Sequence, residues 1–267
     1  MKKVTAIVPC LNEKSTVAGV VNALQECKVI HSIILVDDGS QQETKAVILS
    51  LPKKKLIILS LQQNVGKGGA VKLGLRFVNT PFVFLCDADL EGLQPSHIEE
   101  IVIPVLEGRA EVCVGLKDTY GSIGKNLRKS LLPLIAGERA MPAKLLREVL
   151  ENELSQKYGL EPVINFHCKS NKLRVMKIIL KGVRDKPKYR KWDNGFSYFV
   201  DETRNIATVY AKLYVQPDYQ LQRIAGMKIL PRKAKTALEK QYNTYSLAYK
   251  YGLKPSIKRF LRKIDLP

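Results

Sequence analysis

The sequence predicts an α/β fold in which a mainly parallel sheet is covered by helices on both faces. Short apolar runs alternate with segments of helical periodicity over residues 4–115, and turns rich in Gly, Asn and Asp separate them. Parallel strands need a crossover connection, which is usually a helix, so this alternation favours a parallel sheet. The 267 residues, 45% of them hydrophobic and 26% charged, suffice for one large domain or two small ones and exclude disorder and fibrous repeats.

The expected elements follow one another in a regular order. Each strand is a short run of apolar residues, and the first is expected to stop at Pro9. The first helix is expected from Val17, because apolar residues recur there at intervals of three and four. Strands are expected over residues 4–8, 32–36, 56–61, 82–86, 111–115 and 173–183, and helices from residue 17, over 41–51, after the glycines of 64–69 and from near residue 95.

Polar residues follow the strands at the points where they end. Asn12 and Glu13, Asp37 and Asp38, Asn64, and Asp87 and Asp89 come directly after successive strands. The carboxyl ends of parallel strands meet at one edge of a sheet, so these side chains should gather there. Each motif alone is also typical of an ordinary turn. Together the carboxylates would repel one another unless a cation or hydrogen-bond donors offset them, which predicts a site for a metal and a ligand.

Four of these segments carry a family resemblance. Residues 7–13 (IVPCLNE), 34–40 (ILVDDGS), 64–69 (NVGKGG) and 87–90 (DADL) resemble, in this order, the motifs of family 2 glycosyltransferases with the GT-A fold. The most similar branch is that of the polyprenol-phosphate (dolichol-phosphate type) sugar synthases. The resemblance covers about residues 1–200, and the motifs are more specific for fold and reaction class than for substrate.

The resemblance implies a site for a nucleotide-diphosphate sugar, with UDP and GDP both open as the nucleotide. Pro9, Leu11 and Glu13 would line the nucleoside pocket, and Asp38 would accept a hydrogen bond from the edge of the base. Many relatives place an aromatic ring where this chain has Leu11. Lys67 would lie near the donor, within a glycine-rich loop that lacks the spacing of a P-loop. We expect residues 66–69 to allow close backbone approach to the sugar or diphosphate, with simple turn chemistry as the alternative.

The same resemblance implies a divalent cation, Mg²⁺ or Mn²⁺. Asp89 would be the direct ligand, with Asp87 directed towards the ribose or a metal-bound water. Glu91 could complete a sphere of oxygen ligands around the diphosphate.

The acceptor side is expected further along the chain. Residues 136–140 (AGERA) resemble a family element in which Arg139 would bind phosphate oxygens and act with Asp89 in catalysis; the alternative is an arginine on a surface helix. Arg190 and Lys191 could close over phosphates. Glu161 and Asp118 are possible general bases, although a phosphate acceptor is already anionic at pH 7 and requires none.

Positive charge is concentrated in two segments of the chain. The net charge of +19 lies in residues 169–191, which contribute +9, and in residues 228–263, which contribute +10. Residues 257–264 carry an apolar helical stripe opposite basic side chains, a pattern typical of a helix that lies on an anionic membrane. We therefore expect a glycosyltransferase domain over 1–225 and a basic helical extension over 226–267. The alternative to membrane binding is that this extension packs on the domain.

The family resemblance implies an inverting transferase with a polyprenyl-phosphate-type lipid as acceptor, and together with the basic segments it predicts a cytoplasmic protein that is peripheral on the inner face of the cell membrane. No secretory or membrane-spanning segment is evident, and five scattered cysteines favour buried, reduced thiols. Alternatives are a soluble transferase acting on a sugar hydroxyl or a phosphorylated small molecule, a sugar nucleotidyltransferase, and a nucleic-acid or membrane-binding module with a decayed catalytic edge. Nucleic acid is not expected, since the acidic edge would repel a phosphate backbone.

Overall fold

The computed structural model describes residues 3–117, 136–186, 205–206, 208–210 and 212–213. Contacts divide the chain into two compact units, residues 1–206 and 207–267, and the fold described below belongs to the first. The boundary predicted after residue 225 lies outside the described residues and stays a prediction, as does the basic extension that would follow it.

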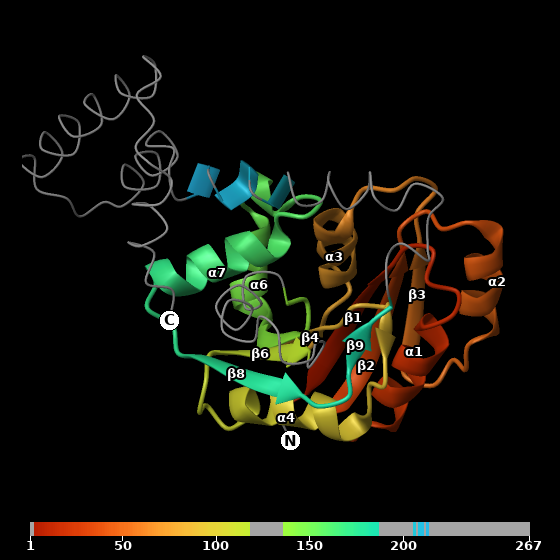
Figure 1. The fold of residues 1–267 in the computed structure, drawn as a ribbon, viewed down its shortest axis with the longest axis horizontal. Coiled ribbons are helices and arrows are strands. Elements are labelled where there is room, and N and C mark those ends of the chain that lie inside the picture. The colour runs from red at the N-terminus through yellow and green to blue at the C-terminus, as the bar shows by residue number, and fades with distance from the viewer. Residues whose placement is uncertain (1–2, 118–135, 187–204, 207, 211, 214–267) are drawn as a thin grey trace, which may run out of the picture. The chain divides into compact units, whose positions relative to one another are not determined.

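A seven-stranded sheet forms the centre of this unit (Figure 1). Its strands run in the order β3-β2-β1-β4-β7-β6-β8, and β7 alone runs antiparallel to its two neighbours. A second sheet joins β5 (Leu90–Glu91) to β9 (Arg184–Asp185). The mainly parallel sheet is therefore confirmed. The strands of the large sheet are β1 (Val4–Cys10), β2 (Ile30–Asp37), β3 (Leu56–Ser60), β4 (Phe82–Leu85), β6 (Val112–Lys117), β7 (Arg139–Pro142) and β8 (Val175–Leu180).

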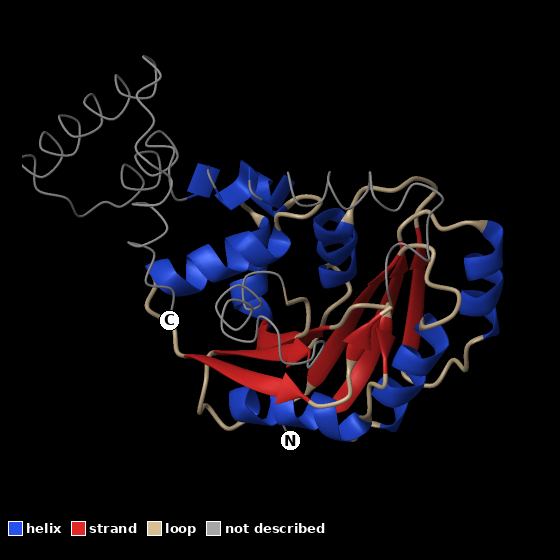
Figure 2. Ribbon diagram, viewed as in Figure 1, coloured by secondary structure: helices blue, strands red, loops and turns tan. Residues whose placement is uncertain are grey.

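Helices cover both faces of the sheet (Figure 2). One face is covered by α1 (Val17–Glu26), α2 (Gln42–Ser50) and α4 (Pro95–Leu106). The other is covered by α3 (Lys67–Leu75) and α6 (Ala143–Leu150), with α7 (Leu160–Ser170) packed on α6 and the short 3-10 helix η2 (Glu153–Ser155) before it. No helix in the part of the chain that the structure describes is long and apolar enough to cross a membrane.

Alternate residues of β1 pack against opposite helix layers. Ala6 and Val8 belong to the core shared with α1 and α4, whereas Ile7 faces α3. A Cβ atom on Gly74 of α3 would lie 2.9 Å from Ile7 Cγ2, so the absence of a side chain lets this helix approach the strand closely. Both faces of the central strands are thus buried, which explains why they read as continuous apolar runs.

Two expectations about strands are corrected. The first strand does not stop at Pro9 but continues to Cys10, with Pro9 opposite Val36 of β2. On the other side β1 pairs with β4 only as far as Ile7, so the missing N–H of Pro9 costs no hydrogen bond to that neighbour. The alternative of a surface helix around Arg139 is also wrong, because this residue begins the buried strand β7.

All five cysteines are buried thiols outside any disulfide, as predicted. Burial raises the pKa of the Cys113 and Cys168 thiols to about 11, so both stay protonated at neutral pH.

Candidate functional site

The loops that follow β1 and β2 contact one another at one edge of the sheet. The backbone N–H of Asn12 donates to Ser40 Oγ at 3.0 Å, and Gln41 N–H donates to Asn12 Oδ1 at 2.8 Å. Asn12 has a φ of 59°, a left-handed conformation that Asn tolerates. Pro9, Leu11 and Glu13, the predicted nucleoside-pocket residues, are half-buried on the same stretch of chain. The predicted convergence of these strand ends is confirmed for this part of the edge.

Asp38 fixes the glycine-rich loop to the end of β2. Its carboxylate accepts hydrogen bonds from the backbone N–H groups of Val65, at 2.8 Å, and Gly66, at 2.9 Å, and the residue is only 3% exposed. Burial raises the pKa of Asp38, the two amide bonds lower it, and neighbouring Asp37 raises it further. The carboxylate therefore holds Gly66, whose φ of 84° favours glycine. Its predicted contact with a base stays a prediction.

The glycines of this loop make room for protein backbone. Gly68 N–H donates to the carbonyl of Lys157 at 3.1 Å, and a Cβ atom on Gly68 would lie 1.9 Å from the carbonyl oxygen of Ser155. A Cβ atom on Gly66 would lie 2.8 Å from Lys157 Cα. The close approach expected here is thus to residues 155–157, from the last residue of η2 into the segment before α7. A close approach to sugar or diphosphate stays a prediction.

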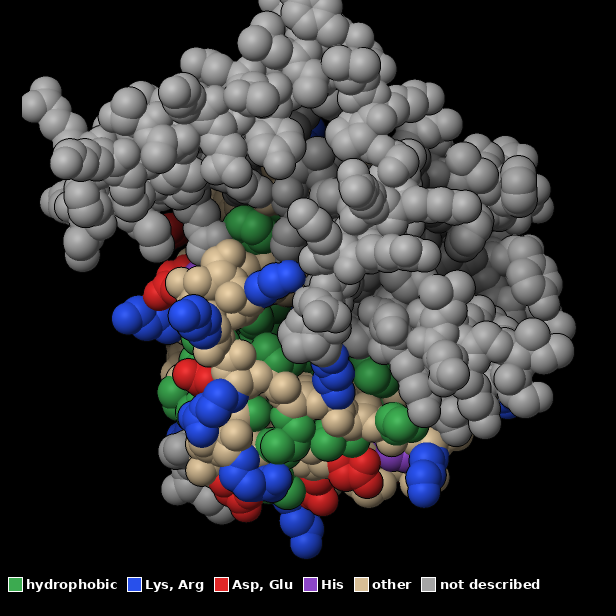
Figure 3. Space-filling view, turned by 60° about the vertical axis from the view of Figure 1, so that its left-hand side comes forward, with side chains coloured by type: hydrophobic (Ala, Val, Ile, Leu, Met, Phe, Trp, Pro, Cys, Tyr) green, Lys and Arg blue, Asp and Glu red, His purple; other side chains and the backbone are tan. Residues whose placement is uncertain are grey.

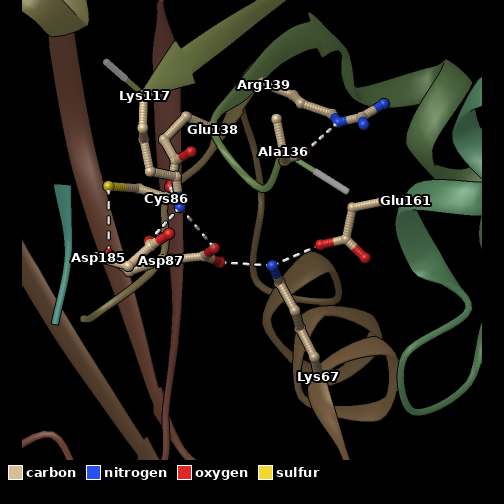
Figure 4. Close-up of polar contacts among 9 residues, drawn as sticks. All are labelled: Lys67, Cys86, Asp87, Lys117, Ala136, Glu138, Arg139, Glu161 and Asp185. Atoms are coloured by element: carbon tan, nitrogen blue, oxygen red, sulfur yellow. Dashed lines mark hydrogen bonds and ion pairs between the residues drawn. The ribbon is translucent and has the colours of Figure 1, made fainter. Parts of the chain in front are cut away.

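Lys67 links the end of β4 to helix α7. Its ammonium lies 2.5 Å from Asp87 Oδ1 and 2.5 Å from Glu161 Oε1, between the two carboxylates (Figure 4). Burial alone would lower the pKa of Lys67, but Asp87 and Glu161 outweigh that effect and raise it, so the group stays charged. Glu161, which the sequence analysis named as a possible general base, therefore forms an ion pair with Lys67.

Lys117 is a site residue that the sequence analysis did not identify. It ends β6, and its ammonium lies 3.3 Å from Glu138 Oε1 and 3.8 Å from Asp87 Oδ2, and pairs with the carboxylate of Asp185 (Figure 4). Burial lowers its pKa, but the surrounding carboxylates raise it well above the usual value. The sequence did contain a signal for this residue, because a lone lysine stands at the end of an apolar run. Polar residues at strand ends are expected to meet at one edge of the sheet, which is the reasoning that identified the acidic turns.

The antiparallel direction of β7 brings residues 136–139 to the same edge. Arg139, at the start of β7, is opposite Leu85 of β4 on one side and Val114 of β6 on the other. Gly137 lies directly against Asp87, because a Cβ atom there would come within 2.2 Å of Asp87 Oδ2. An antiparallel strand starts where its parallel neighbours end, so the AGERA motif joins the acidic turns.

Glu138 is a second site residue outside the predicted set. Its side chain is fully buried, and within the described residues neither carboxylate oxygen makes a hydrogen bond. The pKa of Glu138 is raised to about 7, because burial and the neighbouring Asp87 and Asp185 carboxylates raise it by more than Lys117 lowers it. The motif contains this residue, but only the fold shows that its carboxylate faces the lysine.

Arg139 is 1% exposed and is held by the protein. Its Nε–H donates to the carbonyl of Ala136 at 2.7 Å, and Nη1 donates to Asn165 Oδ1 of α7 at 2.6 Å. In Figure 4 the guanidinium extends away from Lys117, on the side of Glu161. These contacts brace the turn before β7 against α7. The predicted binding of phosphate by Arg139 stays a prediction.

The three predicted metal ligands do not form a closed cage. Among residues 3–117 and 136–186, and the few described beyond them, no three Asp, Glu, His or Cys side chains lie close enough to hold a metal ion. Asp87 faces two lysines, Glu91 lies 3.5 Å from Arg184 Nε, and the carbonyl of Asp89 accepts a hydrogen bond from Lys186 N–H at 3.0 Å.

An open site of this kind fits a metal that the substrate helps to bind. Mg²⁺ is commonly held by one or two carboxylates together with substrate phosphates and water. The charge balance also fits, because the carboxylates that surround Lys67 and Lys117 outnumber these two ammonium groups. The carboxylates are those of Asp87, Asp89, Glu138, Glu161 and Asp185. The roles predicted for Asp118, Arg190 and Lys191 fall on residues outside the described ranges and stay predictions.

Comparison with curated proteins gives a set of distant relatives. The chain is 25% identical over 259 residues to the uncharacterized glycosyltransferase YaiP of Escherichia coli, covering 91% of this chain and 61% of that protein. It is 25% identical over 218 residues to UDP-N-acetylglucosamine–dolichyl-phosphate N-acetylglucosaminyltransferase of Methanococcus voltae, covering 68% of this chain and 86% of that enzyme. It is 31% identical over 101 residues to mouse dolichyl-phosphate beta-glucosyltransferase, covering 33% of this chain and 31% of that enzyme.

Solved structures share the fold. Glucosyl-3-phosphoglycerate synthase from Mycobacterium tuberculosis, in complex with Mn²⁺, UDP and phosphoglyceric acid, superposes with a TM-score of 0.63 at 18% identity, covering 79% of this chain and 78% of that one. The architecture is therefore that of the GT-A glycosyltransferases. The family model described as "Glycosyl transferase family 2" matches residues 5–178, which include most of the sheet and the site. The chain therefore belongs to glycosyl transferase family 2.

Proposed function

We propose that this protein is a metal-dependent, inverting glycosyltransferase that moves a sugar from a nucleotide-diphosphate donor to a polyprenyl phosphate at the cytoplasmic face of a membrane. The observation that carries the proposal is the convergence of the family motifs on one sheet edge, where Asp87, Lys67 and residues 136–139 meet. Relatives that act on dolichyl phosphate support the lipid acceptor. The donor is supported by UDP-bound structures of the same fold.

The residues of this chain would bind and orient the donor. Pro9, Leu11 and Glu13 would line the nucleoside pocket. Asp38 keeps the loop that precedes α3 in place through its bonds to Val65 and Gly66. Lys67 stays charged between two carboxylates, and its ammonium group would add positive charge near the diphosphate. Holding both reactants in a reactive geometry is a large source of rate enhancement.

A divalent cation, when bound, would stabilise the negative charge of the departing diphosphate. Asp89 would hold it, with Asp87 and Glu91 nearby in the chain. The remaining positive charge would come from protein groups, and Arg139 has the planar guanidinium that suits phosphate oxygens. Arg190 and Lys191 would contribute at the acceptor side.

The acceptor requires no base if it is a phosphate. A phosphomonoester has its second pKa near about 6, so an anionic oxygen is available at neutral pH. This agrees with the contact between Glu161 and Lys67, since the Glu161 carboxylate is already occupied by an ion pair. A single displacement by that oxygen forms the new glycosidic bond with inversion and releases the nucleoside diphosphate.

Thermal-shift measurements with UDP and GDP sugars, each with and without Mn²⁺, test the donor and the metal together. Ligands that bind only the folded protein raise the melting temperature. We expect one nucleotide class to stabilise the wild type in the presence of Mn²⁺ and Asp89→Ala to abolish that shift, with Glu107→Ala, an exposed carboxylate of the chain, as control. Stabilisation by none of the sugars would contradict the proposal.

Donor turnover with candidate acceptors then tests the second substrate. Detergent-solubilised polyprenyl phosphate should stimulate release of the nucleoside diphosphate, whereas a water-soluble phosphorylated acid should not. The reverse result would replace the lipid with a soluble acceptor and leave the proposed donor in place.

A further inference from the structure

Both carboxylate oxygens of Asp87 form ion pairs with lysines, and the two lysines come from different elements. Lys67, the first residue of α3, faces Oδ1 at 2.5 Å, and Lys117, the last residue of β6, faces Oδ2 at 3.8 Å. Gly137 lies against the same carboxylate, with room for no Cβ atom. A short side chain between two cations and a backbone has little freedom to rotate, so its direction is set by these neighbours.

Lys117 also connects Asp87 to the second sheet. Its ammonium pairs with Asp185 of β9, and β9 pairs with β5, the strand that begins one residue after Asp89. Lys186, next in the chain, donates its N–H to the carbonyl of Asp89 at 3.0 Å. Thus the same lysine contacts the first carboxylate of the DADL motif and the strand that supports the second.

Glu138 and Asp185 are the carboxylates around Lys117 that have no role in the predicted site, and Glu138 is the more buried of the two. It lies 3.3 Å from the ammonium, is fully buried and is not exposed to a ligand. Lys117 is itself only 10% exposed in its side chain. A buried cation that offsets several carboxylates acts on a ligand through the groups it orients rather than by direct contact.

We propose that Lys117 is a positioning residue of the donor site, which holds Asp87 in the direction needed for donor binding and ties it to β9. The inference rests on the proposed function, since it assumes that Asp87 faces a nucleotide donor. It adds to that function a residue outside the family motifs of this chain, and it assigns the positioning role to Lys117 alone, with Glu138 as its buried counter-charge.

Charge-balanced variants separate this role from folding. Lys117→Met alone would leave Glu138 buried and uncompensated, which is strongly destabilising. Lys117→Met combined with Glu138→Gln removes one positive and one negative charge together. Glu138→Gln alone removes only the partner. Lys117→Arg keeps the cation, and Lys72→Met, an exposed lysine of α3, is the control.

The measurement is the dissociation constant of UDP and of GDP, each with Mn²⁺, by calorimetry at matched folded fraction. We expect the double variant to bind the preferred nucleotide about tenfold more weakly, Glu138→Gln and Lys72→Met within about twofold of wild type, and Lys117→Arg within about threefold. If the double variant does not fold, Asp185→Asn carries the test, because that side chain is 42% exposed and its loss should weaken binding about threefold.

Two results would overturn the inference while leaving the proposed function intact. One is wild-type affinity in the folded double variant or, where that variant is unfolded, in Asp185→Asn. The other is an equal loss in Glu138→Gln alone, which would assign the effect to the carboxylate. Wild-type protein that binds neither nucleotide would instead refute the proposed function and the inference with it.

Discussion

At the scale of single residues, the site depends on one close contact between a glycine and a carboxylate. A Cβ atom on Gly137 would lie 2.2 Å from Asp87 Oδ2 and 2.6 Å from its Cγ, well inside van der Waals contact. Asp87 cannot move aside freely, since Lys67 and Lys117 hold its oxygens. Glycine at this position is therefore required by the placement of the carboxylate, although its own backbone is not in a left-handed conformation.

We expect Gly137→Ala to weaken donor binding more than it weakens folding. The added methyl group should turn Asp87 away from its two lysines, at a stability cost of about 1–3 kcal/mol that the fold can bear. Nucleotide affinity in the presence of Mn²⁺ should fall about tenfold, measured by calorimetry alongside urea unfolding. An unchanged affinity in a folded Gly137→Ala variant would mean that Asp87 does not need the observed orientation.

At the scale of elements, the direction of one strand completes the site. β7 runs antiparallel between β4 and β6, so its first residue lies where those neighbours end. This places Gly137 against Asp87 and Glu138 beside Lys117. A parallel strand in that position would carry the same residues to the opposite edge of the sheet.

The sequence predicts the first part of this arrangement well and the second part poorly. Strands β1 to β4 alternate with α1 to α3, and each strand is an apolar run followed by a polar turn, so periodicity locates them. β7 is four residues long and pairs with strands distant in the chain, and no local pattern specifies its direction. The ion pairs of Lys117 likewise depend on tertiary placement, and only the rule of polar residues at strand ends points to them.

The glycine-rich loop illustrates the same limit. Its composition predicts close backbone approach, and the structure shows which backbone is approached: residues 155–157, about ninety positions further along the chain. Sequence spacing cannot supply that partner. The loop therefore joins α3 to the segment that leads into α7, the helix that carries Glu161.

We expect Gly68→Ala and Gly19→Ala to have opposite effects on stability. A methyl group on Gly68 would clash with the carbonyl of Ser155, a backbone atom that cannot yield without moving its segment, at a cost of about 1–3 kcal/mol. Gly19, within α1, has nothing within 4 Å of its Cβ direction, so alanine there should stabilise the helix by about 0.5–1 kcal/mol. Urea unfolding of both variants measures the difference, and equal stability of the two would contradict the assigned contact.

At the scale of the whole molecule, the chain combines an acidic rim with a strongly basic total charge. The net charge of +19 is concentrated in residues 169–191 and 228–263, whereas carboxylates dominate around Lys67 and Lys117. In Figure 3 lysine and arginine side chains are interspersed with apolar ones on the described surface. Among the described residues, the exposed apolar side chains include Val175 and Ile179 of β8. Such a division suits a protein that binds a cation and donor at the rim and an anionic surface elsewhere.

We expect the full chain to bind vesicles containing anionic lipid and to be released by salt. Each basic residue near such a surface contributes roughly 1 kcal/mol, and screening weakens this attraction as the ionic strength rises. Replacing Lys258, Arg259, Arg262 and Lys263 with Gln should abolish cosedimentation with these vesicles at about 0.1 M salt while leaving the Mn²⁺-dependent nucleotide shift unchanged. Neutral vesicles and an RNA duplex are the controls. Binding to the RNA in preference to the anionic vesicles would contradict the predicted membrane binding. Loss of both vesicle and nucleotide binding in the variant would mean that residues 258–263 support the catalytic domain instead.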